Sequence, residues 1–341
     1  MKRHLLLSAT QSITAAALCH GAALPERLMD QFSINKRTAL ALLRELVATH
    51  WLVREGSARS PHYKPGPLRQ VVQRYALATL REDQPWAQDF APFFELRPSV
   101  ARLAQHAFSE LLNNAIDHSG GSQVTLSLRQ TALHLQLLVS DDGCGLFDRI
   151  QRSFDIADPQ VAMLELSKGK LTTQPEQHSG HGLFFTSRLA DIFDLHANAA
   201  AYRFCSAESG HWAKGRPLAR PGTSIYWAVA LDSPRSLQAV LQAHSVDAQA
   251  HCFDSTALPL HLMLGPQVGL ESRGQAKRVL SLLPQFRRAE LDFSGVDEIG
   301  HGFADELFRV LPRLFPEIDL RPVGMAPNVA AMVASVHRAS A

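Results

Sequence analysis

The sequence predicts a multidomain α/β protein, because three different patterns follow one another along the chain. Short amphipathic helices fill the N-terminal part, and a long amphipathic helix followed by alternating strands fills the middle. The C-terminal part alternates strands and helices as a second, smaller layered domain would. A chain of 341 residues is long enough for several such domains, each with its own core.

The composition, with 46% hydrophobic and 19% charged residues, is that of a folded globular protein and excludes a disordered one. No apolar run approaches the ~20 residues of a membrane helix, so we expect no membrane partner. Residues 1–19 resemble a secretory signal, but polar residues interrupt the apolar run, and we interpret it as a helix. The scattered cysteines show no metal-ligand spacing, which fits free thiols in the cytoplasm.

Residues 1–65 hold nine Lys/Arg and four Asp/Glu, so this segment is basic on a chain of net charge +2. Such a segment indicates a polyanionic partner. Its pattern predicts helices over about 5–19, 24–31 and 35–50, then a strand at 51–53, a turn, and a returning strand over 59–64. In the third helix we expect Leu40, Leu43 and Val47 to form the buried stripe, with Leu42 and Leu46 beside it.

This order of elements resembles a winged helix-turn-helix domain. The resemblance implies that the third helix enters the major groove of DNA and that cations of the wing contact phosphates. A winged helix used only to dock another protein is the alternative, and the basic charge favours DNA. The DNA-contacting residues would be Asn35, Lys36, Arg37, Thr38 and Arg44 on the helix, with Arg59 and Lys64 on the wing.

Residues 66–98 are expected to connect the first domain to the next. We predict a connector helix over Leu68–Leu80 and then a linker rich in aromatic residues and proline. Its aromatic side chains are expected to join the core of the following domain rather than to bind a cofactor. They are Trp86, Phe90, Phe93 and Phe94.

A long helix is predicted from about Val100 to His118. Its apolar arc is formed by Leu103, Ala104, Ala107, Leu111 and Ala115, because these positions share one face. Glu110, Asn114 and Asp117 share the opposite face, at a spacing of four and then three residues. On the helix alone, a solvated face explains these polar residues as well as a binding site does.

Four further segments after this helix carry candidate ligand-binding motifs or the strands that position them. Alternating residues over 124–129 and 133–140 predict a β-hairpin. The hairpin ends in Asp141-Asp142-Gly143-Cys144-Gly145, where glycines allow close approach of a ligand and a carboxylate can bind a base edge. A mostly polar segment, 146–179, leads to Gly180-His181-Gly182. These residues begin a helix that is expected to run through Phe193. The free N–H groups at the start of such a helix can bind an anion. Gly222-Thr223 then precedes a strand over 225–229.

The order Glu-x-x-x-Asn-Ala, Asp-x-Gly-x-Gly, lid, Gly-x-Gly and Gly-Thr over about 99–231 resembles the GHKL superfamily of gyrase-, chaperone-, histidine-kinase- and MutL-type ATPases. The resemblance implies the GHKL-type α/β sandwich, called the Bergerat fold, with ATP and Mg²⁺ held under a mobile lid. No phospho-acceptor helix or dimerisation coiled coil precedes these motifs, which argues against a sensor histidine kinase.

Roles follow from the resemblance residue by residue. Asn114 would ligate Mg²⁺ through its amide oxygen. Glu110 would activate water, or a hydroxyl in a serine kinase. Lys168 and Lys170 are candidates to screen phosphate charge, and a surface Lys-Gly-Lys turn explains them equally well. We assign no role to Asp117, His118 or His181. Asp141 would receive the adenine amino group, supported by Thr223, while Gly143 and Gly145 shape the purine floor and Gly180 and Gly182 wrap the phosphates.

Residues 232–341 predict a third domain. We expect strands over 258–264, 289–293 and 318–322 and helices over 272–283, 302–311 and 328–338. The run from Leu291 to Arg309 resembles the STAS-like domain of unknown function that accompanies GHKL domains in bacterial regulators. Where related anti-sigma-factor antagonists carry an acceptor serine or threonine, this chain has Gly300-His301-Gly302-Phe303, which puts a phospho-switch in doubt. We interpret Ser294 as a turn residue.

Together these observations predict a cytoplasmic bacterial regulator in which Mg-ATP controls a DNA-binding winged helix and a STAS-like tail able to bind a protein. One alternative is an enzyme, either a slow ATPase or a serine/threonine protein kinase similar to the anti-sigma kinases. Another is a protein-docking module without catalytic activity.

Overall fold

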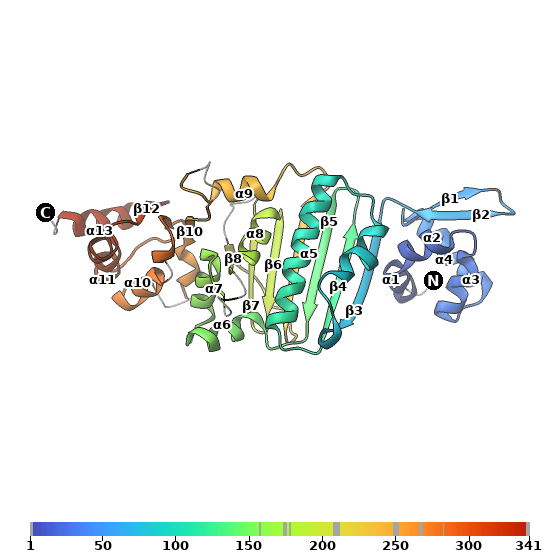
Figure 1. Ribbon diagram of the computed structural model, residues 1–341, viewed down its shortest axis with the longest axis horizontal. Coiled ribbons are helices and arrows are strands. Elements are labelled where there is room, and N and C mark those ends of the chain that lie inside the picture. The colour runs from blue at the N-terminus through green and yellow to red at the C-terminus, as the bar shows by residue number, and fades with distance from the viewer. Residues whose placement is uncertain are drawn as a thin grey trace. The chain divides into compact units, whose positions relative to one another are not determined.

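The computed structural model describes residues 3–156, 158–172, 176, 179–206, 212–247, 252–265, 269–281 and 283–338. It divides into two compact units, which we call unit 1 (residues 1–143 and 222–234) and unit 2 (residues 144–221 and 235–341). Figure 1 labels the helices and strands along the chain. Within the described ranges, none of the helices has the length and apolar character needed to cross a bilayer.

Unit 1 begins with a helical cluster and a hairpin (Figure 1). The helix predicted over 5–19 is wrong in one respect, because the chain turns at Ser12, whose N–H donates to the carbonyl of Ala9 over 3.1 Å. Two shorter helices therefore stand in its place. The elements are α1 (Arg3–Thr10), α2 (Ile13–His20), α3 (Leu24–Phe32), α4 (Lys36–Ala48), β1 (Leu52–Gly56) and β2 (Pro61–Pro65), and the last two pair antiparallel as the two strands predicted over 51–64 require.

The buried face of α4 differs from the predicted stripe. Ala39, Leu42, Leu43 and Leu46 are buried, whereas Leu40 is exposed. The predicted stripe was rotated by about one residue, because the sequence alone does not show which of several neighbouring leucines meets α1 and α3. These residues share one core with Ala9, Ile13, Leu24, Leu28 and Trp51.

The predicted connector helix over Leu68–Leu80 is wrong. Residues Arg69–Ala76 form strand β3, which pairs antiparallel with the following strand so that Arg69 lies opposite Gln130. Adjacent β-branched residues, Val71 and Val72, favour a pleated strand over a helix. Arg69 is almost fully buried, and its guanidinium contacts the carbonyls of Gly66 and Phe93 and the carboxylate of Glu95.

The rest of unit 1 is an antiparallel sheet covered by one long helix. The sheet order is β3-β4-β5-β9, with β4 (Gln123–Gln130), β5 (His134–Asp141) and β9 (Thr223–Ala230). Helix α5 (Pro98–His118) lies across this sheet and contacts β5 and β9. The hairpin and the helix are confirmed. Trp86 and Phe90, in the short turns between β3 and α5, pack as tilted rings against Phe108 of α5 at ring-centroid distances of 5.3 and 5.0 Å, which confirms their packing role.

The first part of unit 2 contains α6 (Leu146–Phe154), α7 (Pro159–Lys168), α8 (Gly182–Leu189) and the antiparallel strands β6 (Ile192–Ala197), β7 (Ala200–Cys205) and β8 (Trp212–Lys214). The helix predicted to run through Phe193 ends earlier, because Ala190 is extended at ψ 153° and β6 follows. Alternation of buried Phe193, Leu195 and Ala197 is the strand pattern that the sequence analysis overlooked.

The second part of unit 2 begins with α9 (Leu237–Ala243) and continues as a parallel three-stranded sheet, β10-β11-β12, with helices between the strands (Figure 1). The predicted alternation is confirmed, although the first strand ends at Pro259 rather than Leu264. Leu164 of α7 belongs to the core of this sheet. The further elements are β10 (Ser255–Pro259), α10 (Arg273–Leu280), β11 (Arg288–Asp292), α11 (His301–Asp305), α12 (Leu311–Leu314), β12 (Asp319–Val323) and α13 (Pro327–Arg338).

Candidate functional site

Helix α5 presents a polar face at the positions that its periodicity predicts. The opposite face is buried from Val100 to Ala115, while Glu110 and Asn114 are only half-buried. His106 lies one turn before Glu110, and its buried Nε2 makes no hydrogen bond with the described residues. Burial lowers the pKa of His106, and the charge of Glu110 opposes that shift. His106 was not among the residues predicted from the sequence, although its four-residue spacing from Glu110 places both on one helix face.

Asp141 is held at the end of β5 by the backbone. It is 5% exposed, and its Oδ1 accepts hydrogen bonds from the N–H groups of Gly143 (2.9 Å) and Thr223 (3.2 Å). Thr223 begins β9, the strand beside β5, so the two strand ends meet at this carboxylate. The hydroxyls of Ser140 and Ser224 lie 2.5 Å apart just below it.

The neighbouring Asp142 has a different environment. Its side chain is exposed and accepts the N–H groups of Ser122 and Gln123 and the hydroxyl of Ser122, over 2.7, 2.9 and 2.6 Å. These hydrogen bonds, that of the Ser122 hydroxyl first, lower the pKa of Asp142. Asp142 therefore fastens the start of β4, and Asp141 is the buried acid of the pair.

Two glycines of unit 1 pack too closely for any side chain. A Cβ on Gly143 would lie 2.2 Å from the carbonyl oxygen of Ser119, and one on Gly222 would lie 2.3 Å from that of Asp141. Gly222 also has a φ of +84°, which L-residues rarely adopt. Unit 1 thus brings together Asp141, Gly143 and Thr223, beside a helix that carries Glu110 and Asn114.

The other predicted glycines lie in unit 2. Gly145 precedes α6 with a φ of +85°, and a Cβ there would lie 2.5 Å from the amide of Asn198. Gly180 has a φ of +73°, and Gly182 is the first residue of α8. The ring of His181, between them, packs edge-on against Phe185 and Phe253, and burial lowers its pKa.

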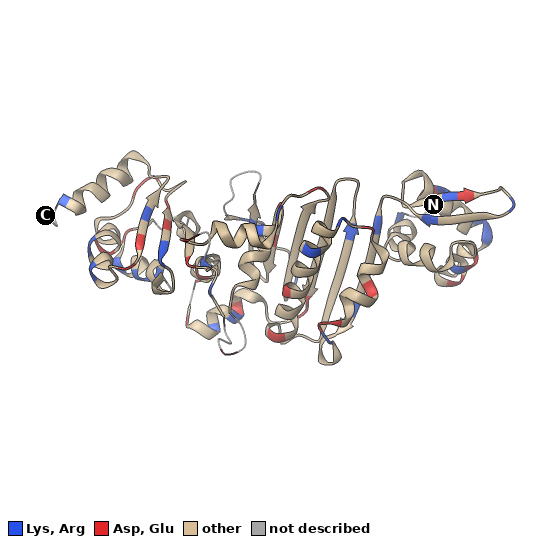
Figure 2. Ribbon diagram, turned by 45° about the horizontal axis from the view of Figure 1, so that its top comes forward, with Lys and Arg blue, Asp and Glu red and all other residues tan. Residues whose placement is uncertain are grey.

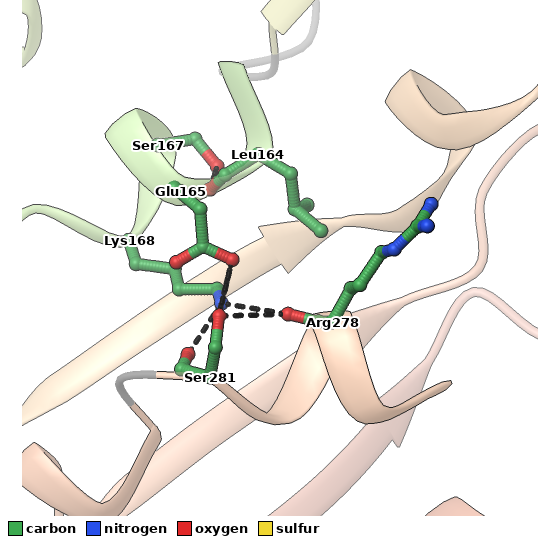
Figure 3. Close-up of polar contacts among 6 residues, drawn as sticks. All are labelled: Leu164, Glu165, Ser167, Lys168, Arg278 and Ser281. Atoms are coloured by element: carbon green, nitrogen blue, oxygen red, sulfur yellow. Dashed lines mark hydrogen bonds and ion pairs between the residues drawn. The ribbon is translucent and has the colours of Figure 1, made fainter. Parts of the chain in front are cut away.

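Lys168 and Lys170 take positions that the sequence analysis did not anticipate. Lys168 is fully buried, and its ammonium donates to Glu165 (2.8 Å) and to the carbonyls of Arg278 (3.3 Å) and Ser281 (2.5 Å), as Figure 3 shows. Burial lowers the pKa of Lys168, and the charge of Glu165 opposes the shift. The contacts of the Lys168 ammonium therefore pack α7 on α10.

Lys170 is also used in packing. Its ammonium lies 4.2 Å from the centre of the Phe286 ring and donates to the carbonyl of Gln285 over 2.5 Å. Burial lowers its pKa, against the opposing charge of Asp254. The alternative prediction, in which Lys168 and Lys170 belong to a surface turn, is therefore wrong for both residues.

In the N-terminal module, Asn35 caps α4, since its side chain accepts from the N–H (2.9 Å) and hydroxyl (3.0 Å) of Thr38. Lys64 pairs with Glu55 across the hairpin at 2.8 Å. Figure 2 marks the Lys and Arg positions of this module as blue segments of the ribbon. The exposed ones on α4 and in the hairpin are Lys36, Arg37, Arg44, Arg54, Arg59 and Lys64.

The C-terminal module lacks an acceptor hydroxyl at the start of α11, where Gly300 is packed against Glu271. Ser294 lies in a turn after β11, and its N–H donates to Asp292 over 2.9 Å. This is the role expected for it.

Comparison with known families gives two matches. Residues 99–225 match the histidine kinase-, DNA gyrase B- and HSP90-like ATPases, and residues 275–330 match a STAS-like domain of unknown function. Residues 1–98 lie outside both matches. A search of the curated proteins found no match to the chain.

Proposed function

We propose, from the premise that the chain contains a GHKL-type ATPase domain and a STAS-like domain, that it is a regulator in which Mg-ATP binding controls DNA binding by the N-terminal module. The ATPase match itself implies ATP binding. Adenine would bind Asp141 with support from Thr223, and Gly143 and Gly145 would shape the floor beneath it. Gly180 and Gly182 would wrap the phosphates.

The observation that carries the proposal is the buried carboxylate of Asp141. Two backbone N–H groups fix its position, and it ends the strand beside β9 in a place where Gly143 and Gly222 leave no room for other side chains. A fixed carboxylate is an acceptor for the exocyclic amino group of a purine. Closely packed glycines beside it suit the approach of a flat base.

The donor set of unit 1 fits Mg²⁺ delivered with the nucleotide. Within the residues that the structure describes, no group of three or more His, Cys, Asp and Glu could hold a metal ion. Mg²⁺ typically keeps several waters and binds through one or two protein oxygens plus substrate phosphates. The amide oxygen of half-buried Asn114 can supply such a ligand.

The test compares adjacent aspartates by titrating each variant with Mg-ATP in a calorimeter. Asp141→Asn is expected to weaken binding at least tenfold, about 1.4 kcal/mol, because an amide presents N–H groups where the purine donates. Asp142→Asn is the matched control and should retain wild-type affinity, since its remaining oxygen still accepts from the start of β4. Equal affinities of the two variants would exclude Asp141 from adenine recognition.

Contacts within unit 1 support a link between the nucleotide and the N-terminal module. The hydroxyl of Thr14 in α2 accepts the N–H of Gln70 (3.0 Å), and the carbonyl of Gln11 accepts that of Val72 (3.3 Å). Both N–H groups belong to β3, which pairs with β4, which pairs with β5, the strand that ends at Asp141. Arg129 of β4 also lies over the ring of Trp51, 5.6 Å from its centre.

A second function, ATP hydrolysis or phosphoryl transfer to a protein hydroxyl, is favoured by the position of Glu110. This carboxylate lies on the same helix face as Asn114, one turn away, and one turn before it lies the Nε2 of His106, which has no hydrogen-bond partner among the described residues. A carboxylate beside the metal ligand is placed to accept a proton from an attacking oxygen.

A further inference from the structure

Unit 2 contains a cavity of about 470 Å³ where the end of α6 and helix α7 face α10. This volume lies in the range of pockets that bind small organic molecules. The apolar part of its wall consists of Phe154, Ile156, Val161 and Leu171. The cavity contains none of the residues assigned above to ATP or DNA.

Glu165 forms part of the wall and carries an unsatisfied oxygen. The residue is 4% exposed, and its Oε1 accepts from the Lys168 ammonium (2.8 Å) and the Ser281 hydroxyl (2.5 Å), as Figure 3 shows. Its Oε2 is buried and has no hydrogen-bond partner among the described residues. Since Lys168 already balances the charge, the missing partner is a neutral O–H or N–H donor rather than a second cation.

Two cations lie on the same wall at α10. Lys277 and Arg278 are exposed, and neither side chain pairs with a carboxylate in the described part of the chain. Of the two aspartates on the wall, Asp158 caps α7 by accepting the N–H of Gln160 over 2.8 Å, and Asp155 is exposed at the end of α6. The unpaired cations therefore complement an anionic group at the rim.

We propose that this cavity, the α7–α10 pocket, binds a small amphiphilic acid. Such a ligand has a carboxylate or phosphate for Lys277 and Arg278, an apolar body for the apolar wall, and a hydroxyl or N–H donor for Oε2 of Glu165. Its donor end meets the buried network that joins α7 to α10, so occupancy and the packing of these two helices depend on one another. This proposal does not depend on ATP binding.

The test uses the full chain and a matched series of probes in calorimetric titrations. The complete probe is para-hydroxyphenylpropanoate, phenylpropanoate lacks only the hydroxyl, and para-propylphenol lacks only the acid. The complete probe is expected to bind on the order of tenfold more tightly than either truncated one, because each lacks one polar contact. Equal affinities of the series, or no binding of the complete probe, would overturn the proposal.

Charge reversal locates the site. The double variant Lys277→Glu, Arg278→Glu changes exposed side chains, so its folding is expected to be preserved, and binding of the complete probe should fall at least tenfold. Arg313→Glu changes an exposed side chain of α12 that does not line the pocket, and it is the matched control that should bind like the wild type. Unchanged binding in the double variant would place the probe elsewhere and refute the assignment.

Discussion

At the scale of single residues, Asp141 and Asp142 differ in what surrounds them rather than in chemistry. The motif spacing pointed to Asp141, and the structure gives a physical reason, because one carboxylate is buried between two strand ends and the other ties down a third strand. Lys168 shows the opposite case. Its Lys-Gly-Lys context looked like a surface turn, and its partner Ser281 lies 113 positions later, beyond the reach of local patterns.

The residue on which enzymatic activity depends is Glu110. We expect Glu110→Gln to abolish ATP hydrolysis or phosphoryl transfer while Mg-ATP binding stays within about threefold of the wild type, because the amide cannot accept a proton. Radiolabelled ATP measures both products, since free phosphate reports hydrolysis and a labelled protein band reports transfer. Asn114→Ala should instead weaken Mg-ATP binding itself. Turnover that survives in Glu110→Gln would remove this residue from catalysis.

The buried ion pair of Glu165 and Lys168 predicts a large stability effect. We expect Lys168→Met to destabilise unit 2 by about 3–5 kcal/mol, because it leaves a buried carboxylate without its counter-charge. The double variant Glu165→Met, Lys168→Met should lose much less, since it removes both charges. Urea denaturation of the wild type, both single variants and the double variant gives the coupling energy. Additive losses would show that the pair is not coupled.

At the scale of elements, the aromatic cluster around α8 and α9 predicts a pH dependence. His244, at the end of α9, packs against Phe184 and Phe253 at ring-centroid distances of 4.8 and 6.1 Å. Burial, assisted by the charge of Arg188, lowers the pKa of His244 to about 4. The unfolded chain therefore binds this proton first as the pH falls.

Keeping His244 neutral and buried therefore adds to the free energy of unfolding. This contribution is fully present above the ordinary pKa of about 6.5 and is lost as the pH falls towards 4. The full loss is about 3 kcal/mol. Thermal unfolding between pH 7 and pH 4.5 measures most of this loss, and His244→Phe should flatten the dependence of stability on pH by removing the proton site. His50→Asn, at an exposed left-handed position, is the control and should leave the slope unchanged. A wild-type slope in His244→Phe would contradict the prediction.

Helices and strands with a strong hydrophobic periodicity could be predicted from the sequence. Elements whose conformation depends on pairing with a distant part of the chain could not. Helix α5, the β4–β5 hairpin and the alternation after β10 follow from local patterns. Strand β3 was predicted as a helix, because its strand character depends on pairing with β4, about fifty positions later. The end of α8 was misplaced because a helix and an alternating strand both accommodate Phe193.

At the scale of the whole molecule, the distribution of charge separates the N-terminal module from the rest, and the ATPase match lies outside it. We expect the affinity of the full chain for duplex DNA to differ at least fivefold between the nucleotide-free state and the state bound to Mg²⁺ and a non-hydrolysable ATP analogue. Fluorescence anisotropy at constant ionic strength measures it, and affinity should fall as salt rises.

The control for this prediction is charge reversal on α4. The double variant Lys36→Glu, Arg37→Glu should lose DNA binding in both nucleotide states while keeping its affinity for the ATP analogue, since both side chains are exposed. Identical DNA affinities with and without nucleotide would rule out the coupling. If the wild type binds no DNA in either nucleotide state, and the double variant loses binding to a partner protein, the docking alternative would be favoured.

The network that joins Glu165 and Lys168 to Ser281 also determines where this chain can be cut or recombined. A fragment that ends before residue 232 would keep Lys168 but lose the carbonyls of Arg278 and Ser281 that it contacts, and it would expose to water the face of α7 that Leu164 buries against the C-terminal sheet. Grafting a foreign tail after the ATPase region would have the same effect unless α7 and α10 were transferred together. Residues 99–225 and 275–330, which match separate families, are therefore expected to be inherited together, because a boundary between α7 and α10 would separate Lys168 from its partners.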